Sequence, residues 1–171
     1  MATFVLTLLG DDRPGLVSAL SAPINAHGAS WERSQMSRLA GKFAGIAVVT
    51  VADDRYDALV ADLQALGAEG LQVTLDRTDV PDDDGSLQFT LDLLGADRPG
   101  IVAEISAALA SLRVNIEDLS TDVRDAPMAG GTLFEAHAVL DAPADVSSET
   151  LRTKLEELAD ELMVDITLSD G

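Results

Sequence analysis

A ten-residue segment occurs twice in this chain, and the repeat constrains the fold more than any other feature. Residues 8–17 read LLGDDRPGLV, and residues 93–102 read LLGADRPGIV, 85 positions later in a chain of 171. Each copy follows an apolar run typical of a strand and begins an amphipathic helical pattern. We therefore predict two similar units, residues 1–78 and 87–171, joined by a linker at 79–86.

Both units show the same order of predicted elements, strand-helix-strand-strand-helix-strand. In unit one the strands are predicted at 3–9, 29–39, 43–52 and 71–76, and the helices at 14–27 and 56–66. In unit two the strands are predicted at 87–93, 114–123, 132–140 and 163–168, and the helices from Pro99 onward and at 147–161. This order predicts an α+β class made of two ferredoxin-like βαββαβ units. Each has a four-stranded antiparallel sheet with both helices on one face, so the other face and the edge strands are free for pairing.

Composition restricts the class of partner. The formal net charge is −19, with only two lysines, which argues against direct binding of nucleic acid or of an anionic membrane surface. An acid-rich, lysine-poor surface is also typical of salt-adapted proteins. The absence of cysteine excludes disulfides and thiolate catalysis. No signal peptide or membrane-spanning run is predicted, so we expect a cytoplasmic protein.

The repeated turn is the predicted binding region. Gly10 and Gly95 would let the backbone turn sharply or approach a ligand closely. Asp12 and Asp97 stand where a carboxylate can cap a helix, and Pro14 and Pro99 fit its first turn.

Gly15 and Gly100 follow these prolines, inside the predicted first helical turn. A position without a side chain leaves the helix amides bare, which suits a carboxylate or a phosphate. The alternative is that helix-start signals were copied by the duplication without any ligand.

The strand, the Gly-x-Asp-Arg-Pro-Gly-(Leu/Ile)-Val turn, the helix and the Val114-Asn115-Ile116 segment together resemble the ACT domain, once per unit. The tandem is most similar to the two-domain ACT proteins of the glycine-cleavage-system regulatory protein family. The resemblance implies ferredoxin-like modules that bind amino acids or other small metabolites, usually at a junction between domains. It places ligand contacts at the first turn and at the start of the second strand. In this chain those positions are Gly10, Asp12, Arg13, Pro14, Gly15 and Ser30 in unit one, and Gly95, Asp97, Arg98, Pro99, Gly100, Ile101 and Asn115 in unit two.

The two turns are not expected to be equivalent. Asn115 can both donate and accept hydrogen bonds, whereas its counterpart Ser30 departs from the family pattern. The primary site is therefore predicted in unit two, where Asn115 would complete the turn, closed if needed by a neighbouring unit.

These features predict a regulatory protein that is not an enzyme, with no cofactor and no metal. Nothing resembles a catalytic triad, a P-loop or a Rossmann fingerprint. His27 and His137 lie in different units and do not supply converging metal ligands. The expected partners are an amino-acid-like small molecule and a partner protein or a second copy of the chain, as in a dimer. Two alternatives remain open: a structural pair without a ligand, and the regulatory part of an enzyme of amino-acid or one-carbon metabolism.

Overall fold

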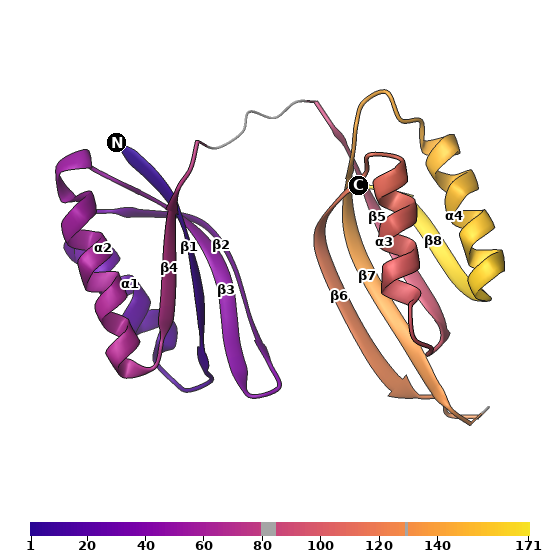
Figure 1. The fold of residues 1–171 in the computed structure, drawn as a ribbon, viewed down its shortest axis with the longest axis horizontal. Coiled ribbons are helices and arrows are strands. Elements are labelled where there is room, and N and C mark those ends of the chain that lie inside the picture. The colour runs from indigo at the N-terminus through magenta and orange to yellow at the C-terminus, as the bar shows by residue number, and fades with distance from the viewer. Residues whose placement is uncertain (80–84, 129) are drawn as a thin grey trace. The chain divides into compact units, whose positions relative to one another are not determined.

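The computed structural model describes residues 1–79, 85–128 and 130–171. It forms two compact units, 1–82 and 83–171, called unit one and unit two below (Figure 1). Most of the predicted linker, residues 80–84, lies outside the described residues.

Unit one has its strands and helices in the predicted order, strand-helix-strand-strand-helix-strand. Its elements are β1 (Ala2–Asp11), α1 (Leu16–Ala26), β2 (Ser30–Leu39), β3 (Lys42–Val51), the short 3-10 helix η1 (Asp53–Arg55), α2 (Tyr56–Gln64), the 3-10 turn η2 (Ala65–Glu69) and β4 (Gln72–Arg77). Unit two repeats the order, with no 3-10 segment among its described residues. Its elements are β5 (Leu87–Ala96), α3 (Ile101–Ser111), β6 (Asn115–Asp125), β7 (Thr132–Ala142), α4 (Ser148–Leu162) and β8 (Val164–Asp170).

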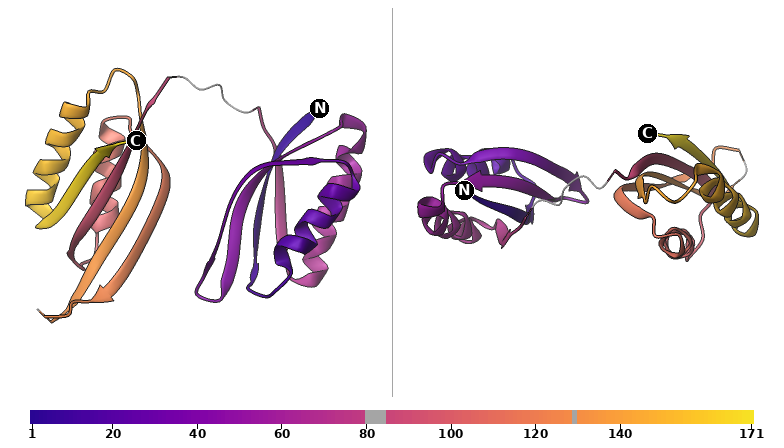
Figure 2. Two further views of the ribbon diagram at one scale, coloured as in Figure 1. Left: turned by 180° about the vertical axis from the view of Figure 1, so that it is seen from behind. Right: turned by 90° about the horizontal axis from the view of Figure 1, so that it is seen from above.

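Each unit has one four-stranded antiparallel sheet, in the order β2-β3-β1-β4 or β6-β7-β5-β8. The first strand of each unit is therefore central, and β2 and β6 are edge strands. Both helices of a unit lie on the same face of its sheet (Figures 1 and 2). The structure confirms the predicted fold class, two ferredoxin-like βαββαβ units.

The cores follow from two periodicities in the sequence. Alternate residues of β1, Phe4, Leu6 and Leu8, point to the helices and are at most 4% exposed. Leu20 and Ile24, four residues apart on α1, pack against these strand residues in the same core. Unit two has an equivalent core around β5 and α3. The opposite face of each sheet is called the open face below, because no helix of its own unit covers it.

Candidate functional site

The two repeated turns connect the central strand of each sheet to its first helix. The helices begin at Leu16 and Ile101, two residues after the predicted start at Pro14 and Pro99. The reason is the glycine between them: Gly15 and Gly100 are the N-cap residues and have left-handed backbones, with φ of +89° and +95°. The prolines therefore lie in the turn before the helix and are exposed.

No side chain caps either helix start. The prediction that Asp12 and Asp97 cap the helices is therefore wrong, because the left-handed glycine separates them from the first helical turn. The carbonyl oxygens of Gly15 and Gly100 accept the first helical hydrogen bonds, from the amides of Ala19 and Glu104, both at 2.9 Å. The amides that precede these donors have no intrahelical acceptor. A Cβ at either glycine would meet nothing within 4 Å, so the torsion angle requires glycine and the space beside it is open.

The two aspartates differ in their partners. Both main-chain amides are fixed in the same way, with Asp12 N donating to Gly41 O and Asp97 N donating to Thr132 O, each at 2.9 Å. The Asp12 carboxylate lies 3.5 Å from the Arg38 guanidinium. The Asp97 side chain is exposed and makes no hydrogen bond or ion pair with any residue that the structure describes.

The two arginines also differ. Arg13 donates to the carbonyl oxygen of Glu69 at 3.0 Å and so ties its turn to the end of η2. Arg98 bonds instead to the carboxylate of Glu104, in the first turn of its own helix, at 3.2 Å. The charge of Glu104 at this helix start is therefore balanced locally by Arg98.

Gly10 and Gly95 belong to the strands, and neither has a positive φ. A Cβ at Gly95 would lie 2.4 Å from Cγ1 of Val164, and one at Gly10 would lie 3.1 Å from the carbonyl oxygen of Gly70. These glycines are thus explained by the close approach of a neighbouring segment of the fold.

Ile101 is also placed differently from the expectation of a ligand contact. Its side chain is 2% exposed and belongs to the core of unit two. Only the main chain of Ile101, as the first residue of α3, adjoins the turn.

Asn115 and Ser30 do not lie beside the turns of their own units. Asn115 pairs with Asp141, which pairs with Gln88 at the start of β5, whereas Gly95 lies at the other end of that strand. Seven residues of strand correspond to about 23 Å. In unit one, Ser30 pairs with Thr50, which pairs with Thr3 near the start of β1, so Ser30 also lies far from Gly10. The expectation that Asn115 completes the turn of its own unit is therefore wrong, because α3 carries the chain back along the sheet before β6 begins.

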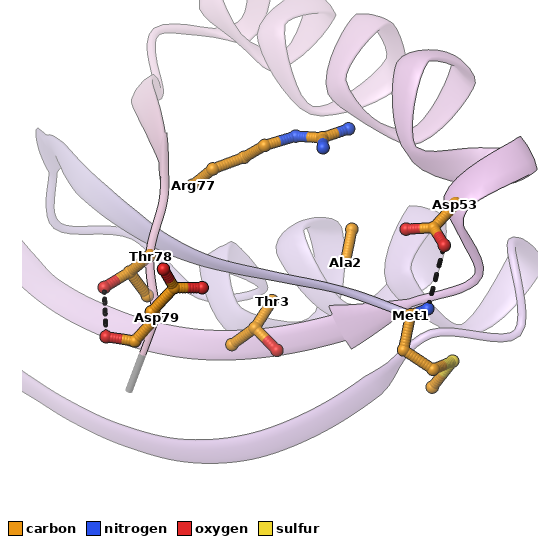
Figure 3. Close-up of a pocket in the computed structure, with 7 residues that line it drawn as sticks. All are labelled: Met1, Ala2, Thr3, Asp53, Arg77, Thr78 and Asp79. Carbon is orange, nitrogen blue, oxygen red and sulfur yellow. Dashed lines mark hydrogen bonds and ion pairs between the residues drawn. The ribbon is translucent and has the colours of Figure 1, made fainter. Parts of the chain in front are cut away.

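A hollow of about 480 Å³ lies at the other end of unit one, lined by Met1, Ala2, Thr3, Asp53, Arg77, Thr78 and Asp79 (Figure 3). The amine of Met1 contacts the Asp53 carboxylate at 2.9 Å there. None of the predicted site residues lines this hollow.

The histidines each have a carboxylate partner. His27 ends α1 and lies 2.7 Å from Asp62 of α2, while His137 lies on the open face of unit two, 2.7 Å from Asp92. Among the described residues, no group of three or more potential ligands could hold a metal ion. Trp31 is half-buried against the core of unit one.

Comparison with known proteins identifies the family. The model of the ACT domain matches residues 2–76 and again residues 88–169, so the chain belongs to the ACT domain family. The glycine cleavage system transcriptional repressor of Escherichia coli is 24% identical over 162 residues, which cover 92% of this chain and 84% of that protein. A UPF0237 protein of Methanopyrus kandleri is 46% identical over 76 residues, which cover 43% of this chain and 77% of the relative.

Solved structures also match the chain along nearly its full length. The crystal structure of an unknown protein from Galdieria sulphuraria superposes with a TM-score of 0.88 at 30% identity and covers 99% of this chain and 98% of its own. No helix in the part of the chain that the structure describes is long and apolar enough to cross a membrane.

Proposed function

We propose that this chain is a non-enzymatic regulatory protein that binds an amino acid at the turn between β5 and α3 and transmits the bound state through protein–protein contacts. Membership of the ACT family supports this proposal. So does the similarity over most of the chain to a protein named as a transcriptional repressor of the glycine cleavage system. The acidic charge of −19 favours a partner protein over DNA as the target of that regulation.

The observation that carries the proposal is the uncapped start of α3 beside a carboxylate without a partner. The bare amides of the first helical turn favour a carboxylate ligand group. Asp97 is the anionic side chain of the same turn that is available for an ammonium group. A zwitterionic amino acid carries both groups: its carboxylate can bind to the helix amides and its ammonium group to Asp97. In unit one the guanidinium of Arg38 already occupies the Asp12 carboxylate, so unit two is the primary site in this proposal.

Asn115 can contribute only from a second copy of the chain. Asn115 begins the edge strand β6, whereas Val123, near the other end of β6, stands level with Gly95. If the β6 strands of two copies paired in an antiparallel manner, Asn115 of the second copy would move toward Val123 of the first. Leu119 and Val123 on this edge are 44% and 48% exposed. The matching positions in unit one are Ser34 and Arg38, so the edge of unit two is better suited to association.

The first test is a thermal-shift screen of the protein against the twenty amino acids, followed by calorimetry with those that raise the melting temperature. Asp97→Asn should weaken binding about tenfold or more, because a charged hydrogen bond is lost. The matched variant Asp12→Asn should have a smaller effect. If Asp12→Asn abolishes binding and Asp97→Asn does not, the site is in unit one. If no amino acid binds, the proposal of an amino-acid ligand is wrong.

A second test separates the torsion angle at Gly100 from the open space beside it. Gly100→Asn keeps a residue that tolerates the left-handed region, whereas Gly100→Val does not. We expect Gly100→Asn to retain most of its stability and yet to lose affinity, because its side chain stands over the amides. Gly100→Val should lose affinity and, in addition, about 1–3 kcal/mol of stability. Full affinity in Gly100→Asn would contradict a ligand at the helix start.

A third test concerns the second copy. Asn115→Ala should weaken binding by about 1–3 kcal/mol, because a ligand group loses its partner. Affinity of the unaltered protein should also rise with protein concentration over the range in which copies associate. Binding by a strictly monomeric sample with unaltered affinity would remove Asn115 from the site.

A further inference from the structure

The open face of the sheet in unit one is more apolar and less acidic than the same face in unit two. Along its two central strands lie Val5 and Leu9 from β1 and Ala44, Ile46 and Val48 from β3, paired across the strands. Leu9 and Ile46 are 48% and 49% exposed, although large apolar side chains of a sheet are normally covered. We call these five residues the unit-one patch.

Register allows each position of this face to be compared between the units. The open face of unit two carries six carboxylates at paired positions: Asp92, Asp118, Asp122, Glu135, Asp141 and Asp165. The residues at the same positions in unit one are Thr7, Arg33, Ser37, Ala44, Thr50 and Gln72, in that order. None is acidic, in a chain whose net charge is −19. Within the patch, Ala44 and Ile46 stand where unit two has Glu135 and His137, whereas Leu9 and Val48 have the apolar counterparts Leu94 and Val139.

We infer that the unit-one patch is a contact between two copies of this chain, packed open face to open face. Two copies of so acidic a protein repel one another wherever carboxylates would be opposed. The five patch positions carry no carboxylate, and Asp76 of β4 stands beside Val5 on the same face. Association over the patch therefore has a lower electrostatic cost than association over the open face of unit two. Aligned packing of two sheets about 10 Å apart is an ordinary arrangement that needs apolar facing residues.

The size of the face agrees with this occupant. Three strands of ten residues and one of six give an open face of about 570 Å² for each copy. Two such faces bury about 1,100 Å², which is in the range of transient protein–protein contacts. A contact of this size is reversible, and it uses a surface separate from the β6 edge and from the turns.

The test is the molar mass of the full chain in solution, measured by sedimentation over a range of concentrations. Ile46→Glu should lower the average mass by one association step, that is by half, at concentrations where the unaltered protein is associated. His137→Glu places the same charge at the matching position of unit two and should leave the mass unchanged. Leu9→Glu, on the neighbouring strand, should reproduce the effect of Ile46→Glu. Circular dichroism melting identifies any variant that fails to fold. The conclusion is drawn from whichever of Ile46→Glu and Leu9→Glu is folded.

Added salt provides an independent readout. Association through the patch should strengthen with salt, because salt screens the repulsion between acidic copies and leaves apolar contacts intact. Weaker association in salt, a monomeric unaltered protein, or patch variants that sediment like the unaltered protein would each overturn the inference. Amino-acid affinity at the β5–α3 turn is measured separately, so failure here does not affect the proposed function.

Discussion

Two glycines at equivalent positions, Gly10 and Gly95, have unequal surroundings. A Cβ at Gly95 would overlap Val164, a buried residue at the start of β8, at 2.4 Å. At Gly10 the nearest atoms, in Gly70 and Leu71, are 3.1 Å away and need to move less. We predict that Gly95→Ala destabilises the protein by about 1–3 kcal/mol and that Gly10→Ala costs less. Urea unfolding measures both, and Gly95→Ala combined with Val164→Ala should recover part of the loss. Equal costs at the two glycines would contradict the distances.

Asp145 provides a residue-scale prediction in pH. The guanidinium of Arg113 donates to its carboxylate at 2.7 Å and holds the pKa of this carboxyl below its ordinary value. The folded state therefore binds fewer protons than the unfolded state near that pKa, so the pair stabilises the protein at neutral pH and this contribution is lost as the pH falls through the lowered pKa. The side chains are exposed and the effect is small. Asp145→Asn should reduce stability at pH 7 and have a progressively smaller effect at acid pH, as the pH falls below the ordinary value of a carboxyl group. A loss of the same size at neutral and at acid pH would rule out the ion pair as the cause.

At the scale of elements, the start of α4 is the one helix start in the described part of the chain where a side chain caps the helix. Ser147 Oγ accepts a hydrogen bond from the amide of Thr150 at 3.1 Å. Ser147→Ala should therefore cost about 0.5–2 kcal/mol, whereas Ser148→Ala, one residue inside the helix, should be nearly neutral. Thermal unfolding of the two variants is the measurement, and a neutral Ser147→Ala would show that the cap contributes nothing.

Most elements could be predicted from the sequence because their periods are clear. Alternation in β5 and the four-residue spacing in α3 each indicate one buried face, and the repeat supplied the second unit. The helix starts could not be placed, since a Pro-Gly pair fits a first helical turn as well as a left-handed cap. Asn115 was misplaced for a different reason: a motif names residues without their register, and eleven residues of α3 carry the chain about 16 Å back along the sheet.

At the scale of the whole molecule, duplication preserved the cores and allowed the surfaces to diverge. Phe4 and Phe89 are both buried at matching positions, whereas Ile46 and His137 share a position on the open faces and differ in chemistry. Packing restricts a buried position to a few apolar residues, while an open face is restricted only by what covers it. The difference between the two open faces thus indicates different surroundings for the two units.

Net charge gives a prediction for the complete chain. Duplex DNA is bound chiefly through lysine and arginine that neutralise phosphates, and this chain has 11 such residues against 30 acidic ones. The cations near the two turns are largely engaged: Lys42 pairs with Asp11, Arg38 with Asp12, and Arg98 with Glu104. We therefore expect no tight binding of a fluorescent duplex at physiological salt, measured by anisotropy, with and without any amino acid that the screen identifies. A submicromolar affinity that falls steeply with salt would show a basic surface assembled in the associated protein, and any gene-regulatory role would then be direct.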